Sequence, residues 1–157
     1  MQVIKITRLS KTELGLIDHL VEESLSQELR FVERLIREYR SGLNCFDQPG
    51  EILLKASVQG AVIGIGGLNR DPYFNDPYIG RLRHLYIKSD WRKQGVGRSL
   101  VHQIIHEAKQ HYQLLTLRTD TLAANQFYQK LGFKTDPNWE HTTHHLQLGT
   151  VTYSPCS

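Results

Sequence analysis

The sequence predicts one α/β domain of the mixed α+β kind, spanning residues 1–157, with helices packed on the faces of a central sheet. Two observations lead to this expectation. The chain has 157 residues, of which 39% are hydrophobic and 22% are charged, values typical of one globular unit with its own core. Strand-like and helix-like runs follow one another in the order β-α-α-β-β-β-α-β-α-β-β, which favours a sheet covered by helices.

The N-terminal part predicts a strand and two helices. Residues 3–9 alternate well enough for a first strand. A short helix is expected over 12–21, where apolar residues keep helical spacing after cap-type side chains. A longer helix is expected over 24–40 and ends at Gly42.

The middle of the chain predicts a β-hairpin and a loop. Two strands are expected over 51–58 and 61–68, and Gln59-Gly60 between them is a tight-turn signal. Residues 71–78 read as a loop because they contain two Asp-Pro steps.

The C-terminal part predicts three strands and a helix. An apolar strand is expected over 114–118, followed by a helix that Thr121 caps and Gly132 ends. Another strand starts at Phe133, and the last strand is expected within 142–152.

Residues 92–98, Arg-Lys-Gln-Gly-Val-Gly-Arg, form the most informative segment. They lie between a strand-like run over 82–88 and a helix-like run over 99–111. The glycines Gly95 and Gly97 let the backbone approach a ligand, and the N–H groups of a first helical turn attract anions. The segment therefore predicts a binding site for a phosphorylated ligand.

Basic charge is concentrated around this segment. The whole chain has a formal net charge of only +3. Between residues 81 and 98 a single acid, Asp90, faces these basic residues: Arg81, Arg83, Lys88, Arg92, Lys93 and Arg98. A charge of +3 is too small to predict nucleic-acid binding. The cluster instead supports a local anion site.

Other classes of protein are disfavoured by simple patterns. We expect a cytoplasmic protein without a membrane span, because the N-terminus lacks a signal-like apolar run and no apolar stretch approaches the roughly 18 residues that a span requires. Cys45 and Cys156 are far apart, so free thiols are expected, with a disulfide as the alternative.

Competing sites were weighed against the anion site. The P-loop spacing would require Gly at 92 and Lys at 98, where arginine stands in both places. His102 and His106 lack the glutamate of a zinc helix motif, and His141, His144 and His145 are expected to be solvated. We therefore expect no metal site.

Two motifs together resemble a known family. The first is Arg92, Gly95 and Gly97 after the strand residues 85–87; the second is residues 123–133, Ala-Ala-Asn-Gln-Phe-Tyr-Gln-Lys-Leu-Gly-Phe. In this order and spacing they resemble the GNAT superfamily of acyl-CoA-dependent N-acetyltransferases, over nearly the whole chain. The resemblance implies a mixed, mostly antiparallel sheet of six to seven strands with about four helices on both faces.

The resemblance also implies acetyl-CoA as co-substrate and assigns residues to it. Backbone N–H groups at 93–98 would hold the pyrophosphate, and residues 85–87 would pair with the pantetheine arm. An N–H of Leu85 or Tyr86 would polarise the thioester carbonyl. The implied cofactor-binding residues are Leu85, Tyr86, Ile87, Arg92, Lys93, Gln94, Gly95, Val96, Gly97, Arg98, Ser99, Asn125 and Tyr128.

Two residues are candidates for catalysis. Tyr128 would protonate the departing thiolate, and because Asn125 lies three residues earlier we expect both on one helix face. Relatives place a glutamate early in the fourth strand as the base, but positions 81–83 here are Arg-Leu-Arg. His84 is the nearest titratable replacement, since an imidazole pKa near 6.5 suits a base, although an ordinary sheet histidine is the alternative. Further candidates are Asp71, Asp76 and Glu33.

The implied acceptor is an amine, from a small molecule or from a peptide or protein. Polyamines, aminoglycosides, amino acids, peptide N-termini and lysine side chains all stay open. Acidic helix residues could attract a cationic amine or simply form a solvated face: Glu22, Glu23, Glu28, Glu33 and Glu38. A homodimer is possible, and a non-catalytic acyl-CoA sensor on the same fold is the alternative function.

Overall fold

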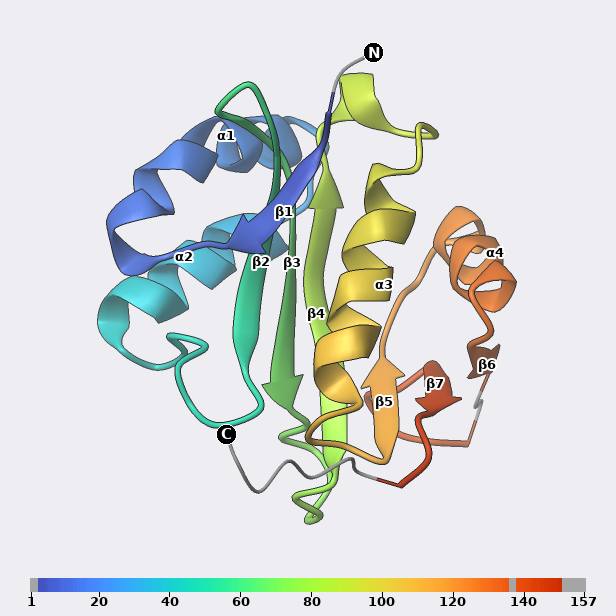
Figure 1. Ribbon diagram of the computed structural model, residues 1–157. Helices are drawn as coiled ribbons and strands as arrows, with labels where there is room; N and C mark the ends of the chain where they lie inside the picture. Colours follow the sequence, from blue (N-terminus) through green and yellow to red (C-terminus); the bar gives the residue numbers. More distant parts are fainter. Residues whose placement is uncertain (1–2, 136–137, 151–157) are drawn as a thin grey trace.

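The computed structural model describes residues 3–135 and 138–150 and contains one seven-stranded sheet in the order β1-β2-β3-β4-β5-β7-β6 (Figure 1). All neighbouring strands are antiparallel except β4 and β5, which are parallel. The strands are β1 (Lys5–Arg8), β2 (Ile52–Val58), β3 (Ala61–Arg70), β4 (Ile79–Ile87), β5 (Leu114–Leu117), β6 (Lys134–Thr135) and β7 (His144–Gln147). This confirms the expected mixed, mostly antiparallel sheet.

Helices cover both faces of the sheet. The helices are α1 (Asp18–Ser26), α2 (Phe31–Ser41), α3 (Val96–Ala108) and α4 (Leu122–Lys130), with short 3₁₀ helices at Lys11–Ile17 and Ser89–Trp91. The helices α1 and α2 lie on one side, whereas α3 runs across the other side with α4 beside it (Figure 1). We call these two sides the α2 face and the α3 face.

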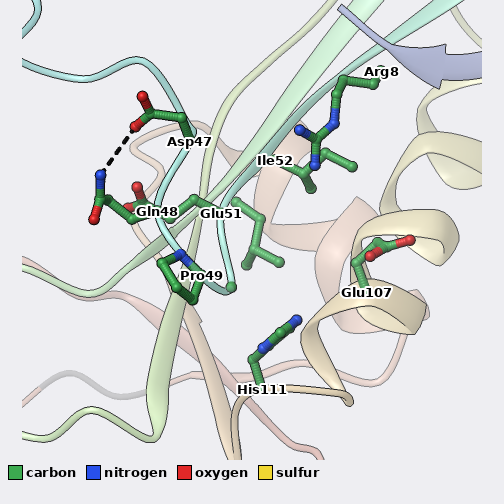
Figure 2. Close-up of a pocket in the computed structure, with 10 residues that line it drawn as sticks. Arg8, Asp47, Gln48, Pro49, Glu51, Ile52, Glu107 and His111 are labelled. Atoms are coloured by element: carbon green, nitrogen blue, oxygen red, sulfur yellow. Dashed lines mark hydrogen bonds between the residues drawn. The ribbon is translucent and has the colours of Figure 1, made fainter. Parts of the chain in front are cut away.

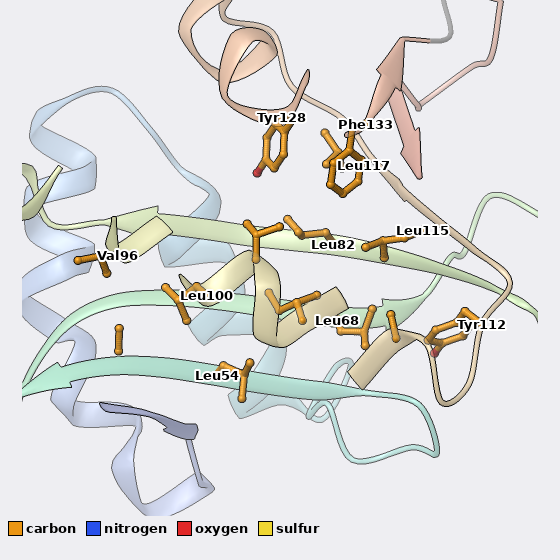
Figure 3. Packing of buried hydrophobic residues seen from close by; sticks show 14 of the residues in the cluster. Leu54, Leu68, Leu82, Val96, Leu100, Tyr112, Leu115, Leu117, Tyr128 and Phe133 are labelled. Carbon is orange, nitrogen blue, oxygen red and sulfur yellow. The ribbon is translucent and has the colours of Figure 1, made fainter. Parts of the chain in front are cut away.

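Each face has its own hydrophobic cluster. The α3-face cluster joins α3 and Tyr128 of α4 to the sheet through residues such as Leu82, Leu100 and Leu115 (Figure 3). The α2-face cluster joins α1 and α2 to the sheet through residues such as Val32, Leu35, Ile65 and Tyr86. Two separately packed faces leave β4 in the centre of the molecule.

The single helix expected over 24–40 is wrong, because the chain breaks between α1 and α2. The N–H of Leu29 bonds the carbonyl of Ser24 (2.9 Å) and the N–H of Glu28 bonds the carbonyl of Leu25 (3.0 Å). This is a Schellman helix end, with Glu28 in the left-handed region at φ 62°. Glycine is the usual residue there, so the glutamate concealed the break.

Other element boundaries also moved. The strand expected over 82–88 begins earlier, at Ile79, and the helix expected from residue 99 begins at Val96. The first and last strands are shorter than the expected 3–9 and 142–152, and residues 151–152 lie outside the described residues. The Gln59-Gly60 hairpin turn is confirmed, with φ 52° and 83°.

Candidate functional site

Strand β4 is paired on both sides at its start and on one side only afterwards. Its residues Ile79–Arg81 pair with Leu114–Thr116 of β5. The pairing with β3, by contrast, continues to Ile87. The edge of β4 from residue 82 to 87 is therefore turned toward β5 but not paired with it. An unpaired strand edge can accept an extended ligand as an additional strand.

A β-bulge marks the point at which the two strands separate. Gly67 pairs with Arg83 and Ile65 pairs with Tyr86, so Gly66 of β3 faces two residues of β4. His84, in the bulge, is left-handed at φ 60°. As a result Arg83 and His84 both face the α2 side. Gly67, the β3 residue opposite Arg83, lies against Phe46 on that side. The His84 ring packs on the Phe46 ring, with 6.2 Å between the ring centroids.

The backbone direction after the bulge follows from one hydrogen bond. The N–H of Lys88 donates to the carbonyl oxygen of Ile63 on β3 (2.8 Å). Because N–H groups alternate along a strand, those of Ile87 and Leu85 point away from β3, toward the open edge. Of the two expected oxyanion donors, Leu85 is thus oriented better than Tyr86.

The N-terminus of α3 lies at the end of this open edge. Its N-cap is Gly95 (φ 87°), which has no side chain to accept the first helical N–H groups. The first intrahelical bond runs from Ser99 N–H to the carbonyl of Gly95 (3.0 Å). The N–H groups of Val96, Gly97 and Arg98 thus have no intrahelical acceptor, an arrangement that can bind an anion. They belong to the segment for which a phosphate site is expected.

Arg92 does not point freely toward that site. Its Nε donates to the carbonyl of Ile87 (2.9 Å), its Nη2 donates to Oε1 of Gln27 (3.0 Å), and its guanidinium lies over the Tyr86 ring (5.2 Å). Glu23 accepts a bond from the Ser89 N–H (3.0 Å). These contacts attach α1 to the turn before α3. Lys93 and Arg98 remain exposed beside the helix end.

Gly97 faces the space between α3 and α4. A Cβ at Gly97 would lie 3.3 Å from the Phe127 ring of α4 and 3.6 Å from Ile87 of β4. Any side chain larger than a methyl would collide with one of these groups. Gly97 therefore lies where the end of β4 meets the N-terminus of α3 and the side of α4.

Tyr128 projects from α4 into the α3-face cluster. Its ring packs edge-on against Phe127 (5.0 Å) and Phe133 (5.5 Å), and its hydroxyl points toward β4 (Figure 3). Burial raises the pKa of the Tyr128 hydroxyl above its usual value, so the group stays protonated. A protonated hydroxyl directed at the open edge can donate a proton or a hydrogen bond there.

Asn125 shares the helix face of Tyr128, as expected, and both contact His144 of β7. His144 Nε2 bonds Asn125 Oδ1 (2.7 Å), and the His144 ring lies 6.0 Å from that of Tyr128. The Thr143 hydroxyl bonds His144 Nδ1 (2.7 Å) and accepts the Thr119 N–H (3.0 Å). This chain fixes one imidazole tautomer, with Nε2 as the donor to Asn125.

His144 is a residue that the sequence reasoning missed. It was expected to be solvated, but it is 3% exposed, and burial lowers its pKa. No spacing rule links it to Asn125, because 19 positions separate the two residues. Only the pairing of β7 with β5 brings them together. His102 and His106 are exposed, as expected.

His84 is buried between Phe31 and Phe46, which changes its chemistry. Burial, with the positive charges of Arg83 and Arg34, lowers the pKa of His84 to about 3. The expectation that made His84 a base, a pKa near 6.5, does not hold in this environment. The imidazole is neutral at pH 7 but has little affinity for a proton.

Asp71 is part of a buried network rather than a free base. Its Oδ2 lies 3.4 Å from Arg81 Nη1 and accepts the Thr116 hydroxyl, while its Oδ1 accepts the Tyr73 N–H (2.8 Å). Arg81 also donates to the Thr142 hydroxyl (3.2 Å). The network connects β4, β5, the loop after β3 and the segment before β7. Both oxygens of the Asp71 carboxylate are engaged in these contacts.

The other two candidate bases are also placed by the structure. Asp76 accepts the Tyr78 N–H (2.8 Å) within its own turn. Glu33 is half-buried on α2, about 160° around the helix from Phe31, which faces β4. By this helical spacing Glu33 points away from the open edge.

A pocket of about 310 Å³ lies at the opposite end of α3 (Figure 2). It is lined by Arg8, Glu51, Glu107 and His111, among others, and by the turn at residues 47–50. It contains none of the expected site residues.

Residues 3–135 and 138–150 contain no group of three or more His, Cys, Asp or Glu residues arranged to hold a metal ion. None of the helices described combines the length and the apolar character that crossing a bilayer requires. Cys45 is a free, half-buried thiol, and Cys156 lies outside the described residues.

Comparisons with known proteins agree with this fold. The family model of the acetyltransferase (GNAT) domain matches residues 49–135. A structure from Exiguobacterium sp. 255-15, itself an inferred acetyltransferase, is 29% identical with a TM-score of 0.81, covering 92% of this chain and 93% of that one.

Two further structures of this fold carry the cofactor. An Escherichia coli GNAT family N-acetyltransferase in complex with CoA is 20% identical with a TM-score of 0.69, covering 94% of this chain and 82% of that one. An inferred acetyltransferase from Salmonella typhimurium with its cofactor acetyl-CoA is 16% identical with a TM-score of 0.70, covering 92% and 94%.

Proposed function

The chain belongs to the GNAT acetyltransferase family, and on that basis we propose that it transfers the acetyl group of acetyl-CoA to a primary amine by direct attack in a ternary complex. The observation that carries the proposal is the open edge of β4 leading to the uncapped N-terminus of α3. An extended arm with a diphosphate at one end matches this arrangement, with the arm along the open strand edge and the diphosphate at the helix N-terminus.

The residues beside the edge suggest how the cofactor is held. The N–H groups of Val96, Gly97 and Arg98 would bind the pyrophosphate. The backbone of residues 85–87 would pair with the pantetheine, with the Leu85 N–H directed at the thioester carbonyl. Asn125, oriented by His144, would contact the arm from α4.

Transfer needs a neutral amine and an acid for the thiolate. Tyr128 is the proposed acid, because its hydroxyl points toward β4. His84 is a weak candidate base, because its pKa is about 3. The reaction therefore relies on positioning and carbonyl polarisation, with the amine losing its proton to water.

The acceptor would approach from the α2 face. Both faces of β4 pack against an apolar cluster, so the polar side chains decide between them. On the α2 face, Arg83 and His84 lie at the bulge where the edge opens. A donor and an acceptor on opposite faces can meet only at the opening between β4 and β5.

Release of free thiol from acetyl-CoA in the presence of amines tests the proposal. Acetyl-CoA binding is measured separately by calorimetry. Amine-dependent thiol release supports the enzyme. If acetyl-CoA binds but no amine in a broad panel causes thiol release, the result would favour a non-catalytic acyl-CoA sensor. That function is compatible with the lack of a carboxylate at strand positions 81–83.

A further inference from the structure

Arg83 is a half-buried cation on β4. It lies in the bulge of β4 and faces the α2 side, because its cross-strand partner Gly67 abuts Phe46 there. Within residues 3–135 and 138–150, its side chain makes no ion pair or hydrogen bond. Holding a guanidinium partly out of water is unfavourable unless an anion compensates it.

Arg34 approaches the same place from α2. It lies one turn after Phe31, whose ring is 6.5 Å from that of His84. The positive charges of Arg34 and Arg83 both lower the pKa of the buried His84 imidazole. Glu38 follows one turn later on the same side of α2 but, in the described structure, forms no ion pair with Arg34.

Two other arginines of this protein, in contrast to Arg83, have an acidic partner. Arg81, two residues before Arg83 on the same face, is paired with Asp71. Arg118, after β5, is paired with Asp120, with 3.7 Å between Arg118 Nε and Asp120 Oδ1. In addition, His84 Nδ1 is buried and unpartnered among the described residues, next to Arg83. Uncompensated polar groups thus collect at the point where the acceptor would arrive.

We infer that the acceptor is an amine that also carries an anionic group, a carboxylate or a phosphate monoester, which Arg83 and Arg34 bind. Guanidinium groups present paired donors that match the oxygens of both anions. The inference rests on the proposed acetyl transfer and specifies its substrate class. It also implies that the acidic helix residues are a solvated face, not the acceptor site.

This anion site is separate from the cofactor's. Arg83 and Arg34 lie on the α2 face, whereas the N-terminus of α3 lies on the opposite face. Changing either arginine should therefore alter the use of the acceptor without altering acetyl-CoA affinity. This separation allows the two proposals to be tested independently.

The experiment compares amines that differ only in the anion. Thiol release is measured with β-alanine against propylamine, with phosphoethanolamine against ethanolamine, and with the common L-amino acids against their carboxamides, at equal concentrations of neutral amine. The anionic member of the preferred pair should have a kcat/KM about 10- to 100-fold higher. The carboxylate and phosphate pairs identify which anion is used.

Three variants assign the effect to the site. Arg83→Gln should raise KM for the anionic amine about 10-fold or more and leave the uncharged amine nearly unchanged. Arg34→Gln, on an exposed helix position that does not affect folding, should give a smaller change in the same direction. Arg37→Gln, exposed on the same helix but turned away from β4, is the control and should have no effect.

Two results would overturn the inference: equal use of charged and uncharged amines, or an unchanged preference in both Arg83→Gln and Arg34→Gln. If acetyl-CoA binds but no amine reacts, the proposed transfer fails instead. In that case calorimetric titration of the CoA-saturated protein with phosphoethanolamine and ethanolamine decides the point. Tighter binding of phosphoethanolamine, lost in Arg83→Gln, supports the anion site; equal binding refutes it.

Discussion

The two halves of β4 differ in almost every respect. The first half, Ile79–Arg81, is paired on both sides and locked by the buried ion pair of Arg81 and Asp71. The second half, residues 82–87, is paired only with β3 and contains the bulge at His84. One strand thus provides an anchor and an open edge, and the bulge separates the two.

This comparison shows why an unpaired edge survives in the centre of a sheet. An open edge is a liability unless something rigid holds its neighbours apart. Here β5 is held against β4 at one end by Thr116, whose hydroxyl lies within hydrogen-bond distance of Asp71 and of the Gly80 carbonyl, and the β4–β5 pairing ends just before the bulge. The rigidity of the first half maintains the opening of the second.

The largest effect is expected from removing the anchor. Asp71→Ala leaves Arg81 buried and uncompensated, so the free energy of unfolding should fall by about 3–5 kcal/mol in urea denaturation. Asp120→Ala, which removes an exposed ion pair with Arg118, is the matched control and should change it by less than about 1 kcal/mol. Similar losses in the two variants would show that the network does not anchor the strands.

Blocking the open half should abolish cofactor binding, which is measured after thermal unfolding has shown that the variant is folded. Gly97→Trp places an indole against Phe127 and Ile87, where the pyrophosphate is proposed to bind. We expect acetyl-CoA affinity to fall at least ~100-fold in calorimetry, since the helix-end N–H groups become inaccessible. Gln129→Trp, on the exposed side of α4, should bind normally. Undiminished affinity in Gly97→Trp would remove the pyrophosphate from this helix end.

Removing only the hydroxyl of Tyr128 should separate chemistry from binding. Tyr128→Phe keeps the ring contacts with Phe127 and Phe133 but loses the proposed proton donor. Turnover should fall about 10- to 100-fold, the usual range for a general acid, while cofactor affinity and stability stay close to wild type. Unchanged turnover would exclude Tyr128 from the mechanism.

The effect that is smallest at neutral pH concerns the bulge residue, because its contribution to stability changes only as the pH falls. The folded pKa of His84 is about 3, below the unfolded value of 6.5, so between these values only the unfolded chain binds the proton. Stability should therefore decrease as the pH falls from 6.5 toward 3, by at most about 1.4 kcal/mol per pH unit.

His84→Asn should remove this contribution while retaining the bulge, because asparagine, like histidine, is one of the non-glycine residues that adopt the left-handed region most readily. The measurement is the slope of unfolding free energy against pH for the two proteins. Equal slopes would mean that His84 titrates normally. Retained thiol release in His84→Asn would further argue that the bulge backbone, not the imidazole, supports catalysis.

Much of the architecture could be predicted, and the errors have identifiable causes. The order of elements, the Gln59-Gly60 turn and the Thr121 cap, whose hydroxyl accepts the Ala124 N–H (3.1 Å), follow from local signals. The break at Glu28 was missed because a glutamate occupies a position that usually holds glycine. The bulge was missed because two consecutive residues, Arg83 and His84, face the same side, against the period of a strand.

The chemistry of single residues was predicted less well than their location. Asp71 was a candidate base and instead supports the anchor, while His144 was expected in solvent and instead orients Asn125. In both cases the partners are distant in the chain, 10 and 19 positions away. Burial and pairing between distant segments set these roles, so no local pattern could reveal them.

Local patterning alone established the order of strands and helices and the glycine-containing turn before α3, because these depend on neighbouring residues and on the geometry of one turn. Whether β4 and β5 would separate, which face would carry Arg83, and how strongly His84 would hold a proton depended on the folded chain. Strand pairing, burial and the electric field of distant charges exist only once remote segments have packed together.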